Sequence, residues 1–80
     1  MEEDVREIQV GKISPNLRTV CTEEGIEEIV QSIRTHGQQE PILIWYTHDS
    51  FRILDGEKRW RACRRLGMNT VKAIIAEVSV

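Results

Sequence analysis

Apolar residues recur at helical spacing between Glu23 and His36. Four of them stand at positions i, i+3, i+4 and i+7 and share one face of a helix: Ile26, Ile29, Val30 and Ile33. Thr22 precedes the stretch and is a suitable N-cap, because its hydroxyl can accept from the free N–H groups of a first helical turn. Gly37 follows as an αL residue that ends the helix. The pattern predicts a helix over Glu23–His36 that covers a sheet with its apolar stripe.

Strand-type patterns occupy four other stretches. Residues 41–47 are a continuous run of strand formers, which is typical of a central strand covered on both faces. The polar residues 48–50 predict a turn, and residues 51–55 predict the returning strand of a hairpin. Residues 5–10 alternate imperfectly and predict an edge strand, and residues 70–78 predict a last strand.

Residues 11–21 show no clear period, and their Ser14-Pro15-Asn16 motif favours an ordered loop. A second helix is expected from Gly56 or Glu57 to Leu66, closed by Gly67. One of its faces is apolar and is expected to pack on the sheet: Trp60, Cys63 and Leu66, with Ala62 beside them.

These elements follow one another in the order β-α-β-β-α-β. The order predicts an α/β (α+β) protein whose small sheet of mixed strand direction is covered by two main helices. The length of 80 residues is enough for one modest core, so a single domain over residues 1–80 is expected.

Charge is distributed unevenly along the chain. Its 11 basic and 13 acidic residues give a net charge of −2, which does not by itself indicate nucleic acid binding. Eight of the acidic residues precede residue 30, whereas five basic residues lie within eight positions: Lys58, Arg59, Arg61, Arg64 and Arg65. We expect a bipolar molecule with one acidic face and one basic edge.

The two cysteines, Cys21 and Cys63, share no C-x-x-C spacing, so they indicate neither a zinc site nor a redox motif. One disulfide between them stays open as an alternative. The N-terminus does not resemble a signal peptide, which favours a reduced, cytoplasmic setting. The longest apolar run, residues 41–46, is far shorter than the ~20 residues of a membrane-spanning helix.

The turn between the strand 51–55 and the second helix is the candidate site. A strand that passes through a glycine into a helix exposes N–H groups at the helix N-terminus, and these donors and the helix dipole favour a bound anion such as phosphate. Arg59, near this open end, is the best ligand candidate. Arg64 and Arg65, near the other end, are favoured by the dipole without any ligand.

Several motifs, taken in order, resemble one known family. The chain carries Ile13-Ser14-Pro15-Asn16, a helix that ends in Arg34-Thr35-His36-Gly37, and then Gln39-Glu40-Pro41-Ile42. These are followed by Gly56-Glu57-Lys58-Arg59-Trp60-Arg61-Ala62 and by Leu66-Gly67-Met68-Asn69-Thr70-Val71-Lys72-Ala73. Together they resemble the N-terminal domain of the ParB partition proteins over nearly the whole chain.

The resemblance implies a ParB/sulfiredoxin-type fold that holds the triphosphate of a nucleotide, which is CTP with Mg²⁺ in the partition proteins. Gly56 would allow the chain to approach the phosphates closely, and Glu57 would lie beside the phosphate or the metal. Lys58, Arg59 and Arg61 would supply charge. Arg18 would stand in for contacts that the family makes after its first turn. The implied nucleotide-binding or phosphate-binding set is Arg18, Gly56, Glu57, Lys58, Arg59 and Arg61.

Two departures from the family pattern bear on function. Full partition proteins continue into a helical DNA-binding region and a dimerising tail, so the chain is expected to be either a fragment or a stand-alone relative. In sulfiredoxin, the related enzyme, a catalytic cysteine occupies the position where this chain has Glu57. This difference argues against reduction of a cysteine sulfinic acid, since Cys63 falls about two helical turns further on.

Several of these residues also have structural interpretations. Glu57 is stabilised by the helix dipole alone, or it meets Mg²⁺ or acts as a base beside a phosphate. Asp55 is expected to be the N-cap of the second helix. The arginines of that helix could instead pair with the acidic half of the molecule. Trp60 is expected in the core, and Trp45 in the core or half-buried, rather than stacked on a base.

Three functions stay open on the sequence. The first is a module in which binding of CTP or another nucleoside triphosphate with Mg²⁺ governs docking to a DNA-bound or second protein partner. The second is a small phosphotransferase or nucleotide hydrolase with Glu57 as catalytic acid or base. The third is salt-sensitive binding to the DNA backbone through Arg59, Arg61, Arg64 and Arg65. The expected partners are the nucleotide, DNA contacted directly or through a region beyond this chain, and a second copy of the chain, but not a membrane.

Overall fold

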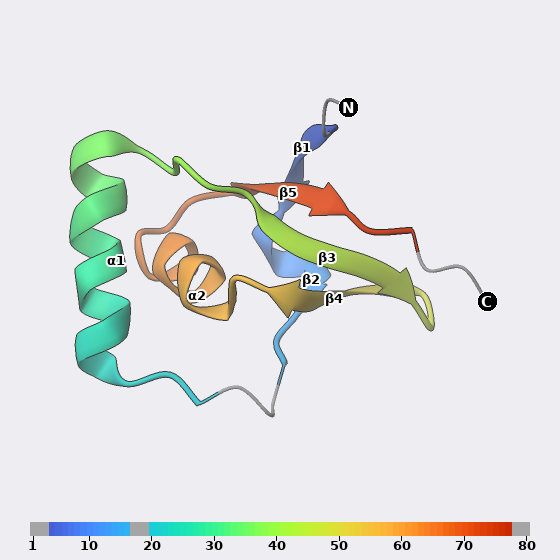
Figure 1. Ribbon diagram of the computed structural model, residues 1–80, viewed down its shortest axis with the longest axis horizontal. Helices are drawn as coiled ribbons and strands as arrows, with labels where there is room; N and C mark the ends of the chain where they lie inside the picture. The colour runs from blue at the N-terminus through green and yellow to red at the C-terminus, as the bar shows by residue number, and fades with distance from the viewer. Residues whose placement is uncertain (1–3, 17–19, 78–80) are drawn as a thin grey trace.

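Residues 4–16 and 20–77 are described by the computed structural model, and they build five strands, two α-helices and one 3₁₀ turn (Figure 1). In chain order these are β1 (Val5–Gln9), the 3₁₀ turn η1 (Val10–Lys12), β2 (Ile13–Ser14), α1 (Glu23–His36), β3 (Ile42–Thr47), β4 (Ser50–Asp55), α2 (Glu57–Arg65) and β5 (Thr70–Ile75). The predicted first helix matches α1 residue for residue, because its apolar stripe, its N-cap and its terminal glycine all agree.

The strands form one mixed sheet in the order β1-β5-β3-β4-β2. β3 lies in the middle, where it pairs in parallel with β5 and antiparallel with β4. β1 forms one edge by antiparallel pairing with β5, and β2 forms the other by parallel pairing with β4. The predicted edge strand, the central position of β3, the hairpin and the fold class are therefore confirmed. The prediction that β3 is covered on both faces is wrong, because Ile42 and Ile44 are buried but the alternate residues are only partly covered.

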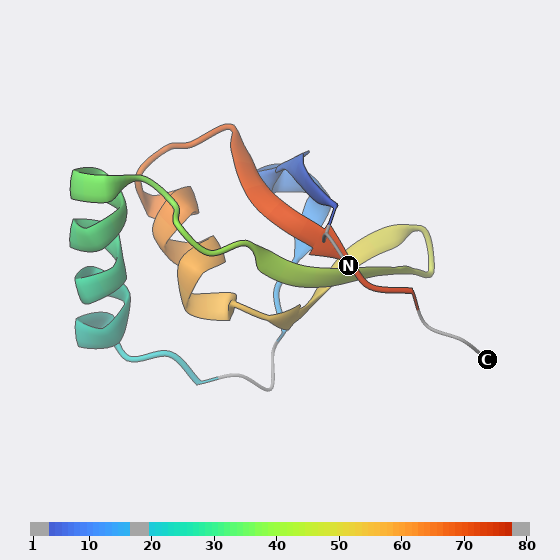
Figure 2. The same cartoon turned by 45° about the horizontal axis from the view of Figure 1, so that its top comes forward.

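The two helices form successive layers on one side of the sheet (Figures 1 and 2). α2 lies next to the strands, and α1 packs mainly against α2. The prediction that α1 covers the sheet directly is wrong in this respect. The reason lies in α2, whose Ala62 and Cys63 have no exposed surface. α2 is therefore buried on two sides, by the strands on one side and by α1 on the other.

A single hydrophobic core joins the three layers. Its buried members come from the sheet (Ile13, Ile42, Ile44, Ile53, Val71, Ala73), from α1 (Ile26, Val30, Ile33), from α2 (Trp60, Ala62, Cys63) and from the turn η1 (Val10). The Nε1–H of Trp60 donates to the carbonyl of Val10 at 3.3 Å, so even its polar atom is satisfied internally. Most of the predicted core positions of the two helices are confirmed, whereas Ile29 and Leu66 are only partly buried and pack against the core. Trp45 of β3 is half-buried.

Residues 11–16 differ from the ordered loop that the sequence predicted, and Val10 differs from the predicted end of the first strand. Val10 begins the turn η1, and its N–H donates to the carbonyl of Asn69 at 2.9 Å. Ile13 is buried, and β2 pairs with β4 through Ile13 and Phe51 and through Ser14 and Arg52. A strand of two residues is too short to show a period, so only its partner strand reveals it.

The helix ends agree with the sequence at two positions and differ at two. The Oγ1 of Thr22 accepts from the N–H of Gly25 at 3.0 Å, and Gly67 follows α2 with a φ of +73°. Gly37 ends α1 with a φ of +77° but is not an αL residue, because its ψ is +175°. The N-cap of α2, however, is Gly56 and not Asp55. Asp55 is the last residue of β4, where its backbone pairs with Leu43, and this pairing commits it to the strand.

Gln38 is a buried polar residue that the sequence analysis did not single out. Its Nε2–H donates to the carbonyls of Glu40 and Lys72, both at 2.9 Å, and its Oε1 accepts from the N–H of Lys72 at 2.8 Å. The Gln38 side chain therefore bonds to the backbone of β5 at Lys72, one residue before Ala73, where the pairing of β5 with β3 begins. It also fixes the connector between α1 and β3.

We expect Gln38→Leu to lower the free energy of unfolding by about 1–2 kcal/mol. This is about the cost of a lost hydrogen bond when water can bond to some of the backbone groups that are left without a partner. Urea unfolding followed by circular dichroism measures the change. The exposed neighbour provides the control, and Gln39→Leu should leave the stability nearly unchanged. Equal effects of the two substitutions would contradict the bridging role of Gln38.

Both cysteines are free thiols, and Cys63 is fully buried. Burial raises the pKa of the Cys63 thiol, which keeps it protonated and unreactive at neutral pH. The alternative of a disulfide is therefore not realised. Among the residues that the structure describes, neither helix is long and apolar enough to cross a membrane.

Candidate functional site

β4 enters α2 through a glycine whose conformation and surroundings both exclude a side chain. Gly56 has a φ of +103°, which L-residues rarely adopt. A Cβ placed on it would lie 2.7 Å from Cγ2 of Ile42 and 2.9 Å from the Cβ of Ile42. Ile42 is fully buried in the central strand, so it has no space to move aside. The turn therefore lies closer to β3 than would be possible with any residue other than glycine at position 56.

A cleft of about 300 Å³ opens at this turn. Four residues of the predicted nucleotide-binding set line it together, namely Gly56, Glu57, Lys58 and Arg59, and its other walls are Ile29, Ile53, Leu54 and Asp55. The first backbone bond of α2 runs from the N–H of Trp60 to the carbonyl of Gly56 at 3.0 Å. The N–H groups that precede Trp60 have no acceptor within the helix, and together with two cationic side chains they suit an anion.

Arg59 forms one side of the cleft and is held there by three oxygen atoms. Its Nη1–H donates to the carbonyl of Pro41 at 2.8 Å, and its Nη2 lies 3.4 Å from a carboxylate oxygen of Glu40 and 3.9 Å from one of Asp55. The side chain is 25% exposed. A guanidinium has five N–H donors, so these contacts position Arg59 and still leave donors for a ligand.

Lys58 also lines the cleft, and its ammonium lies against the first turn of α1. A Cβ placed on Gly25 would be 3.3 Å from the Nζ of Lys58. Gly25 therefore leaves the space that Lys58 occupies. Gly25 was not predicted as part of the site, although a glycine inside a helix costs about 1 kcal/mol relative to alanine and is for that reason a signal of close packing.

Glu57 is buried below the turn with 4% of its surface exposed. One carboxylate oxygen accepts from the backbone N–H of Asn16 at 2.7 Å, and the other accepts from Nε–H of Arg61 at 2.9 Å. The hydrogen bond raises the pKa of Arg61 above its ordinary value. A buried carboxylate whose two oxygens are both bonded is poorly placed to receive a metal ion or to transfer a proton. The geometry favours a structural link between α2 and the segment after β2.

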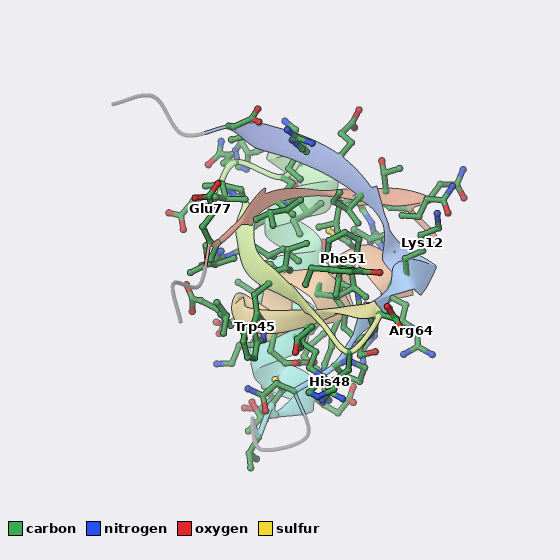
Figure 3. The ribbon with its side chains drawn as sticks, turned by 90° about the vertical axis from the view of Figure 1, so that its right-hand side faces the viewer. Lys12, Trp45, His48, Phe51, Arg64 and Glu77 are labelled. Atoms are coloured by element: carbon green, nitrogen blue, oxygen red, sulfur yellow. The ribbon has the colours of Figure 1, made fainter. Side chains whose placement is uncertain are left out.

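The other basic residues of α2 lie around a different hollow, which Arg61, Arg64 and Arg65 line together with Glu23 and Trp60. Arg65 pairs with Glu23 at 2.8 Å, as expected if the helix pairs with the acidic half of the molecule. The guanidinium of Arg64 lies 5.4 Å from the centre of the Trp60 ring. Figure 3 shows Arg64 at the right-hand edge of the molecule and Trp45 toward the left.

The structure thus divides the predicted site into two parts. Gly56, Glu57, Lys58 and Arg59 share the cleft, whereas Arg61 belongs to the second hollow. Arg18, the remaining member of the set, lies outside the described residues. Within residues 4–16 and 20–77, no three His, Cys, Asp or Glu side chains come together in a group that could hold a metal ion.

Comparisons with known proteins agree with this architecture. The whole chain, residues 1–80, matches the family model of the ParB N-terminal domain. It is 44% identical over 82 residues to the nucleoid occlusion protein of Geobacillus sp. (strain WCH70), covering 98% of this chain and 29% of that protein. It is 40% identical over 79 residues to the nucleoid occlusion protein of Halalkalibacterium halodurans, covering 95% and 28%. The chain therefore spans less than a third of the length of these relatives.

Solved structures show the same likeness. The C-terminally truncated ParB of Caulobacter crescentus complexed with CTP-γ-S superposes with a TM-score of 0.83 at 33% identity, over 95% of this chain and 46% of that one. Sulfiredoxin of Arabidopsis thaliana follows with a TM-score of 0.81 at 27% identity, over 94% and 86%. A free serine kinase in complex with AMP has a TM-score of 0.85 at 22% identity, over 96% and 32%, and shares the fold alone. Family model, relatives and structures together show that this chain belongs to the ParB N-terminal domain family.

Proposed function

We propose that this domain binds a nucleoside triphosphate of the CTP type, with its phosphates in the cleft at Gly56, as part of a DNA-associated partition or nucleoid occlusion protein. Occupancy of the cleft would govern docking to a DNA-bound or second protein partner. One observation carries the proposal. The turn at Gly56 joins free helix N–H donors to Lys58 and Arg59 in one cleft, in a chain that is 33% identical to a ParB solved with CTP-γ-S.

The residues of the cleft fit a phosphate group better than a metal ion held by the protein alone. The cleft offers backbone donors and two cations, and Asp55 is the one exposed carboxylate in its wall. Mg²⁺ commonly keeps water ligands and binds through substrate phosphates, and it would neutralise part of the triphosphate charge. Glu57 is proposed to hold α2 in place rather than to ligate the ion, because both of its oxygens are engaged.

Calorimetric titration of the 80-residue chain with CTP, ATP and GTP, each with and without Mg²⁺, tests the proposal. Saturable binding of at least one triphosphate is expected, and the comparison identifies the base. If no nucleotide binds at millimolar concentration, the cleft is not a nucleotide site in this domain.

Arg59→Ala is expected to weaken binding of the triphosphate about 10- to 100-fold, since a hydrogen bond to a charged group contributes about 1.5–3 kcal/mol. Titration measures the affinity, and the melting temperature of each variant shows that the compared proteins are folded. Arg64→Ala is the matched control, because it removes the same charge from the same helix outside the cleft. Equal losses in both variants would show that the total charge of α2, and not the cleft, attracts the nucleotide.

DNA-backbone binding is the second candidate, and one observation favours it. Arg61, Arg64 and Arg65 line a single hollow. Two of these charges already have acidic partners, because Arg61 pairs with Glu57 and Arg65 with Glu23. Affinity for unrelated duplex DNA with a steep salt dependence, unchanged by nucleotide, would favour this function over the first. The enzymatic alternative requires phosphate release that depends on Glu57, whose buried position does not favour catalysis.

A further inference from the structure

The connector between α1 and β3 brings an acidic side chain to the edge of the cleft. The carboxylate of Glu40 lies 3.4 Å from Nη2 of Arg59 and is 76% exposed. Arg59 lines both the cleft at Gly56 and a neighbouring hollow, which is lined by Gln38, Gln39 and Glu40 on the connector side. A single guanidinium therefore faces a carboxylate of its own chain and the proposed phosphate site.

The connector holds Glu40 in this position through its backbone. The carbonyl of Glu40 accepts from Nε2–H of Gln38 at 2.9 Å, and Gln38 is itself bonded to Lys72 of β5. The next carbonyl along the chain, that of Pro41, accepts from Nη1–H of Arg59 at 2.8 Å. Two successive carbonyls are thus fixed, one to the sheet and one to Arg59. The backbone of Glu40 is therefore fixed beside Arg59, with the guanidinium within reach of its carboxylate.

We propose that Glu40 is an internal competitor of the phosphate ligand for Arg59. The inference rests on the proposed function of the cleft. A phosphate that engages Nη2 of Arg59 competes with Glu40 for the N–H donors of that nitrogen, although the other donors of the guanidinium stay available. The carboxylate therefore lowers the affinity of the site for every phosphate that engages this nitrogen.

Asp55 is a weaker competitor of the same kind. Its carboxylate lies 3.9 Å from the same Nη2, which is farther than that of Glu40. Both carboxylates are exposed, so solvent screens their interaction with Arg59. The expected effect of either is therefore modest, and it is greatest at low ionic strength.

Titrations of the full chain with Mg·CTP and with inorganic triphosphate at low salt test the inference. Glu40→Gln is expected to bind both probes about 2- to 5-fold more tightly than the wild type, the range that exposed ion pairs support. Glu40→Asp keeps the charge but shortens the side chain, so it should show a similar gain if contact with Arg59 matters. Glu24→Gln, which removes a charge from the exposed face of α1, should leave both affinities unchanged.

The outcomes separate this inference from the function on which it rests. Equal affinities of the wild type and Glu40→Gln overturn the competition and leave the nucleotide site standing. A gain in Glu40→Gln without a gain in Glu40→Asp also overturns it, because the effect then comes from the general field of the carboxylate. If neither the wild type nor any variant binds either probe, the proposed function fails and the inference fails with it.

Discussion

Gly56→Ala is expected to lower the free energy of unfolding by about 2–5 kcal/mol. About 1–2 kcal/mol comes from placing an L-residue at positive φ, and about 1–3 kcal/mol comes from overpacking. The added Cβ would stand 2.7 Å from Cγ2 of the buried Ile42. A domain of 80 residues has a total stability of about 4–12 kcal/mol, so the variant would lose much of its margin. Urea unfolding followed by circular dichroism measures the loss.

Two other glycines provide matched controls for Gly56→Ala. Gly37 and Gly67 also have positive φ, but a Cβ at either position would have no non-neighbouring atom of the described chain within 4 Å. Gly67→Ala should therefore lose only the conformational part, about 1–2 kcal/mol. Gly37→Ala should also lose only a conformational part, about 1–3 kcal/mol, because its ψ of +175° lies in a region that is essentially restricted to glycine. The difference between these variants and Gly56→Ala measures the contact with Ile42. Equal losses at all three positions would contradict the close approach of the turn to β3.

Glu57→Ala is expected to lower the free energy of unfolding by about 2–4 kcal/mol. Removing one partner of a buried ion pair costs about 3–5 kcal/mol, and the value is reduced here because solvent screens the partner. Arg61 is 35% exposed, whereas Glu57 is buried. The substitution also removes the acceptor of the hydrogen bond from Asn16. Glu57→Gln keeps an acceptor of the same shape and should lose about half as much. Denaturant unfolding of the free protein measures both effects.

The same variants distinguish a structural role of Glu57 from a catalytic one. If Glu57 links α2 to the segment after β2, Glu57→Ala loses stability whether or not nucleotide is present. Glu24→Ala on the exposed face of α1 is the control for the loss of a carboxylate. A Glu57→Ala protein of unchanged stability that binds nucleotide but no longer releases phosphate would contradict the structural role. It would support the interpretation of Glu57 as an acid, a base or a metal ligand.

The elements with a strong local signal were predicted correctly from the sequence. α1 carries an apolar stripe, an N-cap and a terminal glycine, and β3 is a continuous apolar run, so each is specified by its own residues. β2 was missed because two residues carry no period. Asp55 was assigned as a cap because residue type alone does not reveal that a residue is still paired in β4. The layering of α1 on α2 was missed because an apolar stripe indicates burial and not the element that covers it.

The candidate site shows the same division at the level of single residues. The motif from Gly56 to Arg61 identifies the turn, and four of its residues do meet in one cleft. Arg59 and Arg61 nevertheless separate, because residues two positions apart on a helix point in different directions. The contacts of Gln38 and Glu40 could not be predicted, since their partners Lys72 and Arg59 lie far away along the chain.

The amino-acid sequence alone therefore determined the helices, the longer strands, the glycine turn and the family, because periodicity, capping and motifs are properties of neighbouring residues. Only the tertiary structure decided that Glu57 is buried between Asn16 and Arg61 and that Arg59 faces Glu40 as well as the cleft. These arrangements depend on contacts between segments distant in the chain, and such contacts leave no period in the sequence.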